Sequence, residues 1–168
     1  MFLLIYDSIQ KHPVFAIFMT MTDLVRNKKA GFDFELLERY EAGVELLGTE
    51  VKSLRGGQGK LEGSHVVVRG GEAYLVGASI PAFQLANAPK DYDAERVRRL
   101  LLKKKEILEL FTESEKKGLT IVPTRWYNTR GLLKLEIAIA KGKKKADKRE
   151  AIKGRDSKRD IERILKTQ

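Results

Sequence analysis

Residues 119–140 read LTIVPTRWY (119–127), NTRG (128–131) and LLKLEIAIA (132–140), and these three segments indicate the fold class. In the last segment, large apolar side chains alternate with charged or small ones, and this two-residue period is typical of a strand with one buried face. Asparagine and glycine between the two apolar segments are typical of a turn. The alternating residues are Leu133, Leu135, Ile137 and Ile139 on one face, and Lys134, Glu136, Ala138 and Ala140 on the other. We therefore predict an antiparallel pair of strands.

Further strands are predicted towards the N-terminus. Segments 64–68 and 73–76 flank Arg69-Gly-Gly-Glu72, and a Gly-Gly pair between strands indicates a tight hairpin. Phe32–Leu47 fits either an alternating strand or one face of a helix. Gly43 inside this segment favours a long bent strand, since glycine is poor in a helix interior.

Helices are predicted at two places. Thr49 can cap a short helix, Glu50–Leu54, before a glycine-rich loop. Asp93–Phe111 has an apolar stripe at helical spacing, with Asp93 as its cap. Thr112-x-x-Glu115 is a candidate capping box for one more turn, which Gly118 would close.

These elements predict a mainly β fold. Five or six strands within residues 24–140 suit a small OB-type Greek-key β-barrel with flanking helices. The rest of the chain is a leader, residues 1–23, and a C-terminal tail, residues 141–168.

The leader is apolar but is interrupted by Asp7, Lys11, His12 and Pro13. It has neither the basic start of a secretory signal nor the roughly 20 unbroken apolar residues of a membrane span. We interpret it as a mis-assigned start, with Met19 or Met21 as the true first residue, and we expect no membrane partner.

The tail contains twelve basic and five acidic residues, a net charge of +7 out of +10 for the whole chain. Such a segment cannot form a core, so we predict that it is disordered when free and helical on a polyanionic partner. An RNA-binding arm is favoured over an inert solubilising tail.

Enzymatic and metal sites find little support in the sequence. The 168 residues contain no cysteine and only two histidines, far apart. A phosphate loop ending at Gly59-Lys60 would need glycine at 54 and serine or threonine at 61, where Leu54 and Leu61 stand. We expect no catalytic residues, no cofactor and no metal, and a monomer in a reducing cytoplasm.

Basic clusters outside the tail could also meet phosphates, although for any single cluster an ordinary solvated face is the commoner explanation. Aromatic side chains at Tyr40, Trp126 and Tyr127 could stack on bases, but each is better explained as part of the core. The clusters are Arg26 with Lys28 and Lys29, Lys52 with Arg55, Arg96 with Arg98 and Arg99, and Lys103–Lys105.

Six ordered motifs resemble the SmpB family of SsrA-binding proteins. The most distinctive is the stretch Glu41-Ala-Gly-Val-Glu-Leu46 followed by Gly48-Thr-Glu-Val-Lys-Ser-Leu-Arg55. The others are Asn27-Lys-Lys-Ala30 with Phe32-Asp-Phe34, Gly71-Glu72 before a strand, Arg96-x-Arg-Arg-Leu-Leu-Leu102, Gly118-x-Thr-x-Val-Pro123, and Ala140-Lys-Gly-Lys-Lys144 with Asp147-Lys-Arg149. The resemblance extends from Asn27 to Lys166.

The resemblance implies an OB-type barrel that binds the tRNA-like domain of transfer-messenger RNA. It implies delivery of that RNA to stalled ribosomes for trans-translation, with the tail in the decoding centre and the empty mRNA channel of the small subunit. Family positions on the RNA-binding face match Asn27, Glu41 and Lys134, to which we add the basic residues Lys28, Lys29, Lys52 and Arg55. Tail positions match Gly142, Lys143, Lys144, Asp147, Lys148, Arg149, Ile164 and Leu165, and Lys141 joins them from the basic arm.

Two positions depart from the family pattern. Phe32 stands where histidine is usual, and Ala146 stands where an aromatic residue or histidine is usual. Two other functions stay open at this point: a structural ribosomal protein, and an RNA-modifying enzyme with an OB domain. The absence of cofactor and nucleophile motifs disfavours the enzyme.

Overall fold

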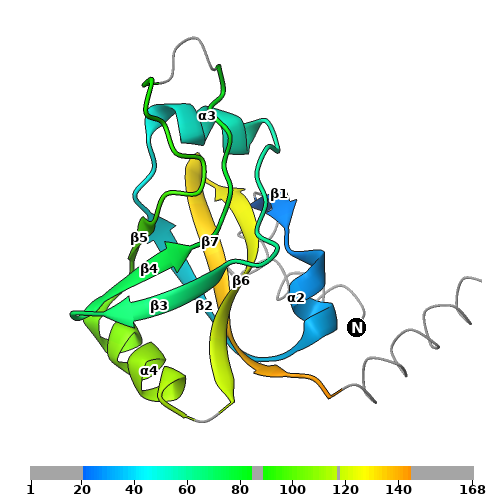
Figure 1. The fold of residues 1–168 in the computed structure, drawn as a ribbon, viewed down its shortest axis with the longest axis vertical. Helices are drawn as coiled ribbons and strands as arrows, with labels where there is room; N and C mark the ends of the chain where they lie inside the picture. The colour runs from blue at the N-terminus through cyan, green and yellow to red at the C-terminus, as the bar shows by residue number, and fades with distance from the viewer. Residues whose placement is uncertain (1–20, 85–88, 117, 145–168) are drawn as a thin grey trace, which may run out of the picture.

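A computed structural model describes residues 21–84, 89–116 and 118–144. Figure 1 shows a sheet that curls around the centre of the molecule, with short helices at its ends. The strands of this part are β1 (Met21–Arg26), β2 (Phe34–Val44), β3 (His65–Arg69), β4 (Glu72–Val76), β5 (Arg98–Leu101), β6 (Leu119–Thr129) and β7 (Leu132–Gly142). Its helices are α2 (Lys28–Asp33), α3 (Gly48–Arg55) and α4 (Lys104–Ser114).

Six of the strands form a closed antiparallel ring. The sheet order is β1-β6-β3-β4-β5-β2-β7, and β7 also pairs with β6, which closes the circle. Strand β1 lies outside the ring and shares one edge of β6 with β3. The predicted mainly β fold is therefore confirmed, and closure removes the free strand edges that an open sheet would have.

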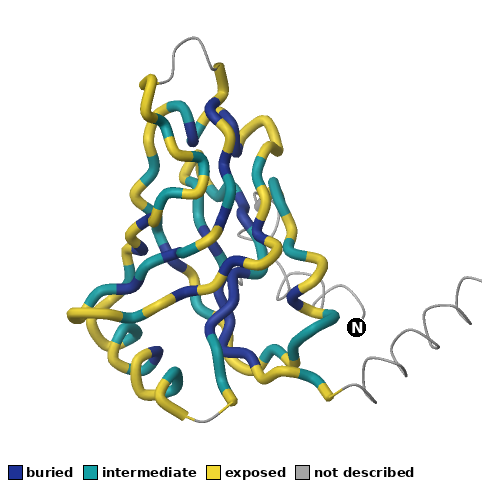
Figure 2. Tube along the Cα trace, in the orientation of Figure 1, coloured by how far each residue is buried: buried dark blue, intermediate teal, exposed yellow. Residues whose placement is uncertain are grey.

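The core fills the inside of the ring and follows the alternation of β7. Leu135 and Ile137 are fully buried there beside Trp126, whereas Lys134 and Glu136 point outward. Figure 2 shows this buried path along the inner strands. The outward-facing Ala140 is also buried, because helix α2 covers it in a second small cluster with Ala30 and Val122.

Both predicted hairpins are present, β3–β4 and β6–β7, and β2 is the predicted long strand. Gly70 and Gly71, between β3 and β4, have φ values of 62° and 75°. Two consecutive residues with positive φ are what a type I′ turn requires, and glycine adopts them without strain.

The predicted helix Asp93–Phe111 is wrong in its first half. Residues 98–101 form β5, and only Lys104–Ser114 is helical. The side chain of Arg98, which a helix would have left at its polar side, is fully buried, and Leu100 packs into the core. Burial of alternate residues stabilises a strand here against helical propensity.

Two predicted caps are also wrong. The carboxylate of Glu50, not Thr49, begins α3 by accepting a 2.7 Å hydrogen bond from the backbone amide of Leu47. Thr112 starts no new helix, since it lies within α4 and donates its hydroxyl to the carbonyl of Leu108 at 2.9 Å. The short elements β1 and α2 were not predicted.

A buried ion cluster joins α3 to β5 and to the residues just before it. Glu50 is fully buried and accepts hydrogen bonds from Arg96 at 2.6 Å and from Arg98 at 2.8 Å. Burial by itself would raise the pKa of Glu50, but hydrogen bonds from Arg96, from the amide of Leu47 and from Arg98 lower it overall. The cluster therefore stays ionised inside the protein.

Several predictions lie outside the described residues. They are the leader before Met21, the disorder and partner-induced helix of the tail, and the tail positions Asp147, Lys148, Arg149, Ile164 and Leu165. Strand β1 begins at Met21, three residues before the predicted start of the domain at Leu24. None of the described helices has the length and apolar character needed to cross a membrane.

Candidate nucleic-acid interface

Glu41 stands on the outer face of the barrel and connects three strands. Its carboxylate, on β2, accepts hydrogen bonds from the hydroxyl of Tyr127 on β6 and from the ammonium group of Lys134 on β7. Hydrogen bonds from Lys134 and then Tyr127 lower the pKa of Glu41. The structure thus brings together two of the predicted RNA-binding residues, Glu41 and Lys134, and fixes the lysine in place.

Tyr127 provides the support beneath this pair. It is 2% exposed, so it has no face left on which a base could stack. Burial, followed by the hydrogen bond to Glu41, raises the pKa of Tyr127, which keeps the hydroxyl protonated and able to donate. Trp126 is fully buried as well, in agreement with the expectation that both aromatic residues belong to the core.

Next to this trio, a second charged row crosses the same outer face. Arg125 on β6 donates to Glu136 on β7 at 2.9 Å and to Asp23 on β1 at 2.6 Å. Arg39 on β2 reaches the other oxygen of Glu136 at 3.2 Å. The guanidinium carbon of Arg125 also lies 5.1 Å from the centre of the Tyr127 ring, within cation–π range.

No sequence motif indicates this row, because its members lie far apart in the sequence. Asp23 is separated from Arg125 by 102 positions. The only signal in the sequence was that Lys134 and Glu136 fall on the outward face of the alternating strand. Cross-strand register, which a single sequence does not give, brings the row together.

Asn27 connects α2 to the barrel. Its side-chain oxygen accepts a 3.0 Å hydrogen bond from the amide of Ala30, which caps the helix. Its side-chain nitrogen donates to the carbonyls of Leu61 at 3.0 Å and Pro123 at 2.9 Å. All of this amide's donor hydrogens are therefore used within the protein, so we assign Asn27 to positioning α2.

The remaining predicted basic residues of the barrel lie on two helices. Lys28 and Lys29 are exposed on α2, directly after Asn27. Lys52 and Arg55 are exposed in the last turn of α3. Arg55 also donates to the carbonyl of Gly131 at 3.1 Å, which ties this helix to the turn between β6 and β7.

The first residues of the tail belong to the folded part. Lys141 and Gly142 complete β7, where they pair with Glu35 and Phe34 of β2. Lys143 then bonds to α2 twice: its amide donates to the carbonyl of Asp33 at 3.0 Å and its ammonium group to that of Gly31 at 2.9 Å. Lys144 is the last described residue and is exposed.

The arginines of the 96–99 motif have partners inside the protein. Arg96 and Arg98 hold the buried Glu50, and Arg99 forms ion pairs with Glu45 at 3.1 Å and Glu72 at 2.5 Å. This candidate phosphate-binding cluster is therefore a structural one. Within the described residues, no group of three or more His, Cys, Asp or Glu side chains could hold a metal ion.

Comparison with known proteins matches residues 24–167 to the family described as SmpB protein. The SsrA-binding protein of Thermosipho africanus (strain TCF52B) is 49% identical over 147 residues, which cover 87% of this chain and 98% of the relative. The SsrA-binding protein of Sulfurihydrogenibium sp. (strain YO3AOP1) is 51% identical over 140 residues, which cover 83% and 91%.

The fold is shared with a solved structure described as "tmRNA-SmpB: a journey to the center of the bacterial ribosome". The two chains are 41% identical with a TM-score of 0.61, over 76% of this chain and 92% of the other. Motifs, barrel and near full-length matches agree, and the chain belongs to the SmpB protein family.

Proposed function

We propose that this protein is a non-catalytic adaptor that binds the tRNA-like domain of transfer-messenger RNA. The complex then enters stalled ribosomes, where trans-translation rescues the ribosome and tags the incomplete peptide. Family membership supports the proposal, since the relatives are SsrA-binding proteins and the similar solved structure is described as tmRNA-SmpB in the bacterial ribosome. Because ribosomes are the site of action, we place the protein in the cytoplasm.

The arrangement around Glu41 carries the proposal within this chain. A carboxylate on a phosphate-binding face would be unfavourable if it stood alone. Here the charge of Glu41 is balanced by Lys134, and the pair is held by the Tyr127 hydroxyl on a rigid barrel. The side chain of Glu41 is still 48% exposed, so the carboxylate can accept hydrogen bonds from a ribose hydroxyl or a base edge.

Cations on the two neighbouring helices supply the non-specific part of the affinity. Lys28 and Lys29 on α2, and Lys52 on α3, are exposed and can approach phosphates. The tail, with its net charge of +7, supplies the ribosome-binding part in the decoding centre and the mRNA channel. The positions matched to that role are Lys141, Gly142, Lys143 and Lys144, followed by Asp147, Lys148, Arg149, Ile164 and Leu165.

Binding of the full chain to the tRNA-like domain, with an elongator tRNA as competitor, tests this function across a salt series. We expect a strong preference for the tRNA-like domain that persists near physiological salt. Glu41→Gln removes one negative charge at the site, and Glu38→Gln removes one from an exposed position on the same strand. A change of affinity in Glu41→Gln alone would therefore come from the site and not from the net charge.

Equal binding to both RNAs, lost steeply as salt increases, would contradict the proposal. That result would mean that charge alone drives the interaction, and a structural ribosomal protein would become the better explanation. Stoichiometric retention on all ribosomes after a high-salt wash would support that second function.

A further inference from the structure

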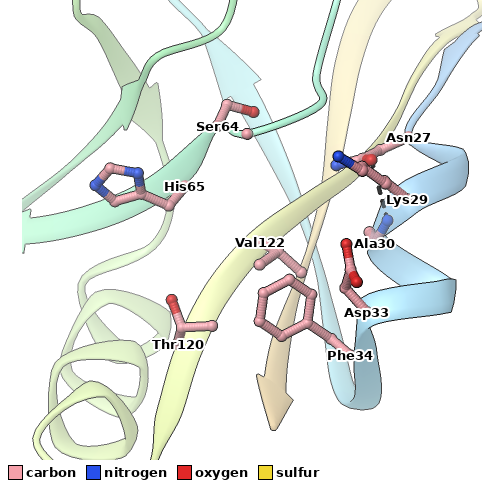
Figure 3. Close-up of a pocket in the computed structure, with 10 residues that line it drawn as sticks. Asn27, Lys29, Ala30, Asp33, Phe34, Ser64, His65, Thr120 and Val122 are labelled. Carbon is pink, nitrogen blue, oxygen red and sulfur yellow. Dashed lines mark hydrogen bonds between the residues drawn. The ribbon is translucent and has the colours of Figure 1, made fainter. Parts of the chain in front are cut away.

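A cavity of about 280 Å³ lies between α2, the entry to β3 and strand β6. Figure 3 shows the side chains around it, with α2 on one side and the entry to β3 on the other. The lining includes Lys29, Ala30, Asp33, Phe34, Ser64, His65, Thr120 and Val122. Of the predicted RNA-binding residues, Asn27 and Lys29 line this cavity, whereas the Glu41–Lys134 pair does not.

One part of the cavity is apolar and well packed. Ala30 and Val122 are 3% exposed and form a small cluster with Phe34, which is half-buried. Figure 3 shows the Phe34 ring beside Val122 at the bottom of the cavity. An aromatic ring next to branched aliphatic groups is a surface on which a flat ring can stack.

Polar groups surround that apolar surface, and their charges balance. Lys29 contributes one positive charge and Asp33 one negative charge, and Ser64, His65 and Thr120 add side chains that can form hydrogen bonds. A balanced pair of charges beside an apolar wall does not suit a phosphate. It suits a neutral ring with donors and acceptors along its edge.

The walls are held by contacts within the protein. Asn27, at the edge of the cavity, bonds to Leu61 and Pro123 through its amide nitrogen. Ser64 donates its hydroxyl to the same Leu61 carbonyl at 2.6 Å. The cavity is thus preformed, which lowers the entropy cost of filling it.

We propose that this cavity receives one unstacked nucleobase from the RNA bound to the barrel. The inference rests on the proposed function, because the base comes from the tRNA-like domain. The ring stacks on Phe34 while its edge bonds to Asp33, Ser64 or Thr120, as proteins commonly read bases extruded from RNA loops. Lys28, which directly precedes Lys29 in the first turn of α2, is exposed and can approach a neighbouring phosphate.

The test uses the full chain and tRNA-like domains that each carry 2-aminopurine at one loop position. Thr120→Phe adds a ring at the edge of the cavity and removes only a methyl and a hydroxyl group. Thr112→Phe adds the same ring to an exposed threonine on α4 and is the matched control. Phe34→Leu removes the stacking surface and keeps an apolar side chain.

We expect the fluorescence of one loop position to be quenched when the native protein binds. Thr120→Phe abolishes the quenching and weakens binding about tenfold, Phe34→Leu reduces both, and Thr112→Phe changes neither. Thermal unfolding of each variant shows whether its barrel is intact, and a destabilised Thr120→Phe leaves Phe34→Leu as the deciding variant.

The absence of quenching at every loop position would overturn the inference, provided that the native chain binds the RNA selectively. Unchanged quenching and affinity in both cavity variants would overturn it as well. Failure of the native chain to prefer the tRNA-like domain over elongator tRNA is a different result, and it would contradict the proposed function itself.

Discussion

The ammonium group of Lys143 donates a 2.9 Å hydrogen bond to the carbonyl of Gly31, so the residue after β7 is tied to helix α2. Gly31 lies in the last turn of α2, where the carbonyl dipoles favour a cation. The same helix exposes Lys28 and Lys29. This contact sets the direction in which the chain leaves the barrel, next to the proposed RNA-binding helix.

Replacing Lys143 with methionine should therefore separate RNA binding from tagging. The apolar stem and the backbone bond to Asp33 remain, but the ammonium bond to Gly31 is lost, so the start of the tail is held less firmly against α2. We expect affinity for the tRNA-like domain to stay within about twofold, since one exposed cation adds little, while tagging of peptides on stalled ribosomes falls severalfold. Lys90→Met, at an exposed lysine outside the tail and the proposed interface, is the control. Equal loss of tagging in both variants would mean that charge, not the contact with α2, matters.

Shortened chains test whether the barrel binds the RNA and the tail is needed for tagging. A chain that ends after Lys144 keeps both bonds from Lys143 to α2, whereas one that ends after Gly142 loses them. We expect both chains to bind the tRNA-like domain nearly as the full chain does, and neither to support tagging. If binding and tagging disappear together in both, the tail is a general RNA anchor.

Glu41 and Lys134 should act as a unit. Glu41→Gln leaves the lysine without its anionic partner, and Lys134→Met leaves the carboxylate without its cation. We expect each change to weaken binding to the tRNA-like domain about tenfold and the double variant to cost less than the sum, because residues in contact couple by about 0.5–3 kcal/mol. A double-mutant cycle on the dissociation constants measures this coupling. Strict additivity would show that the two side chains contact the RNA independently.

Replacing Asn27 should lower the stability of the protein, because its side chain holds α2 to the barrel and does not contact the RNA directly. Asn27→Ala removes the helix cap and both bonds to the Leu61 and Pro123 carbonyls, and we expect a loss of about 2–4 kcal/mol in the free energy of unfolding. Asn27→Asp keeps the cap but places a carboxylate oxygen against those two carbonyls, so it should also destabilise. Urea unfolding gives both values. A fully stable Asn27→Ala with weakened RNA binding would instead make Asn27 a direct RNA contact.

Acid should weaken the barrel through Glu50. Its folded pKa lies below the ordinary glutamate value of 4.5, so its stabilising contribution is complete above that value and is lost as the pH falls through the lower, folded pKa. Glu50→Gln leaves Arg98 buried without its counter-charge and should cost about 3–5 kcal/mol. Tm measured from pH 7 to pH 2 tests both statements, and the variant should show a flatter acid dependence than the native chain.

Sequence patterns predicted the parts of the fold that depend on neighbouring residues. The Gly70–Gly71 turn and the alternation in Leu132–Ala140 are local signals, and both hairpins are present. Strand β5 was missed because Arg98 looks like a surface residue until its partner Glu50, 48 positions away, is placed beside it.

The candidate site also has residues that the sequence indicated and residues that depend on distant strands. Glu41 and Lys134 were found through the family resemblance, and the pairing of β2 with β7 and of β7 with β6 explains why they meet. Tyr127 was predicted as core, but its hydroxyl also supports Glu41, a role that no local pattern indicates. The row through Arg125 depends on the register of four strands, which a single sequence does not contain.

The ring of strands also determines when in its synthesis this protein can become active. The chain closes the barrel with β7, which pairs with β2 and β6 and brings Lys134 to Glu41. A growing chain holds its newest residues inside the ribosomal exit tunnel, so β7 becomes available later than every other strand of the ring. Closure must therefore wait until Leu132–Gly142 has left the tunnel. Until then the emerging chain has no complete RNA-binding face.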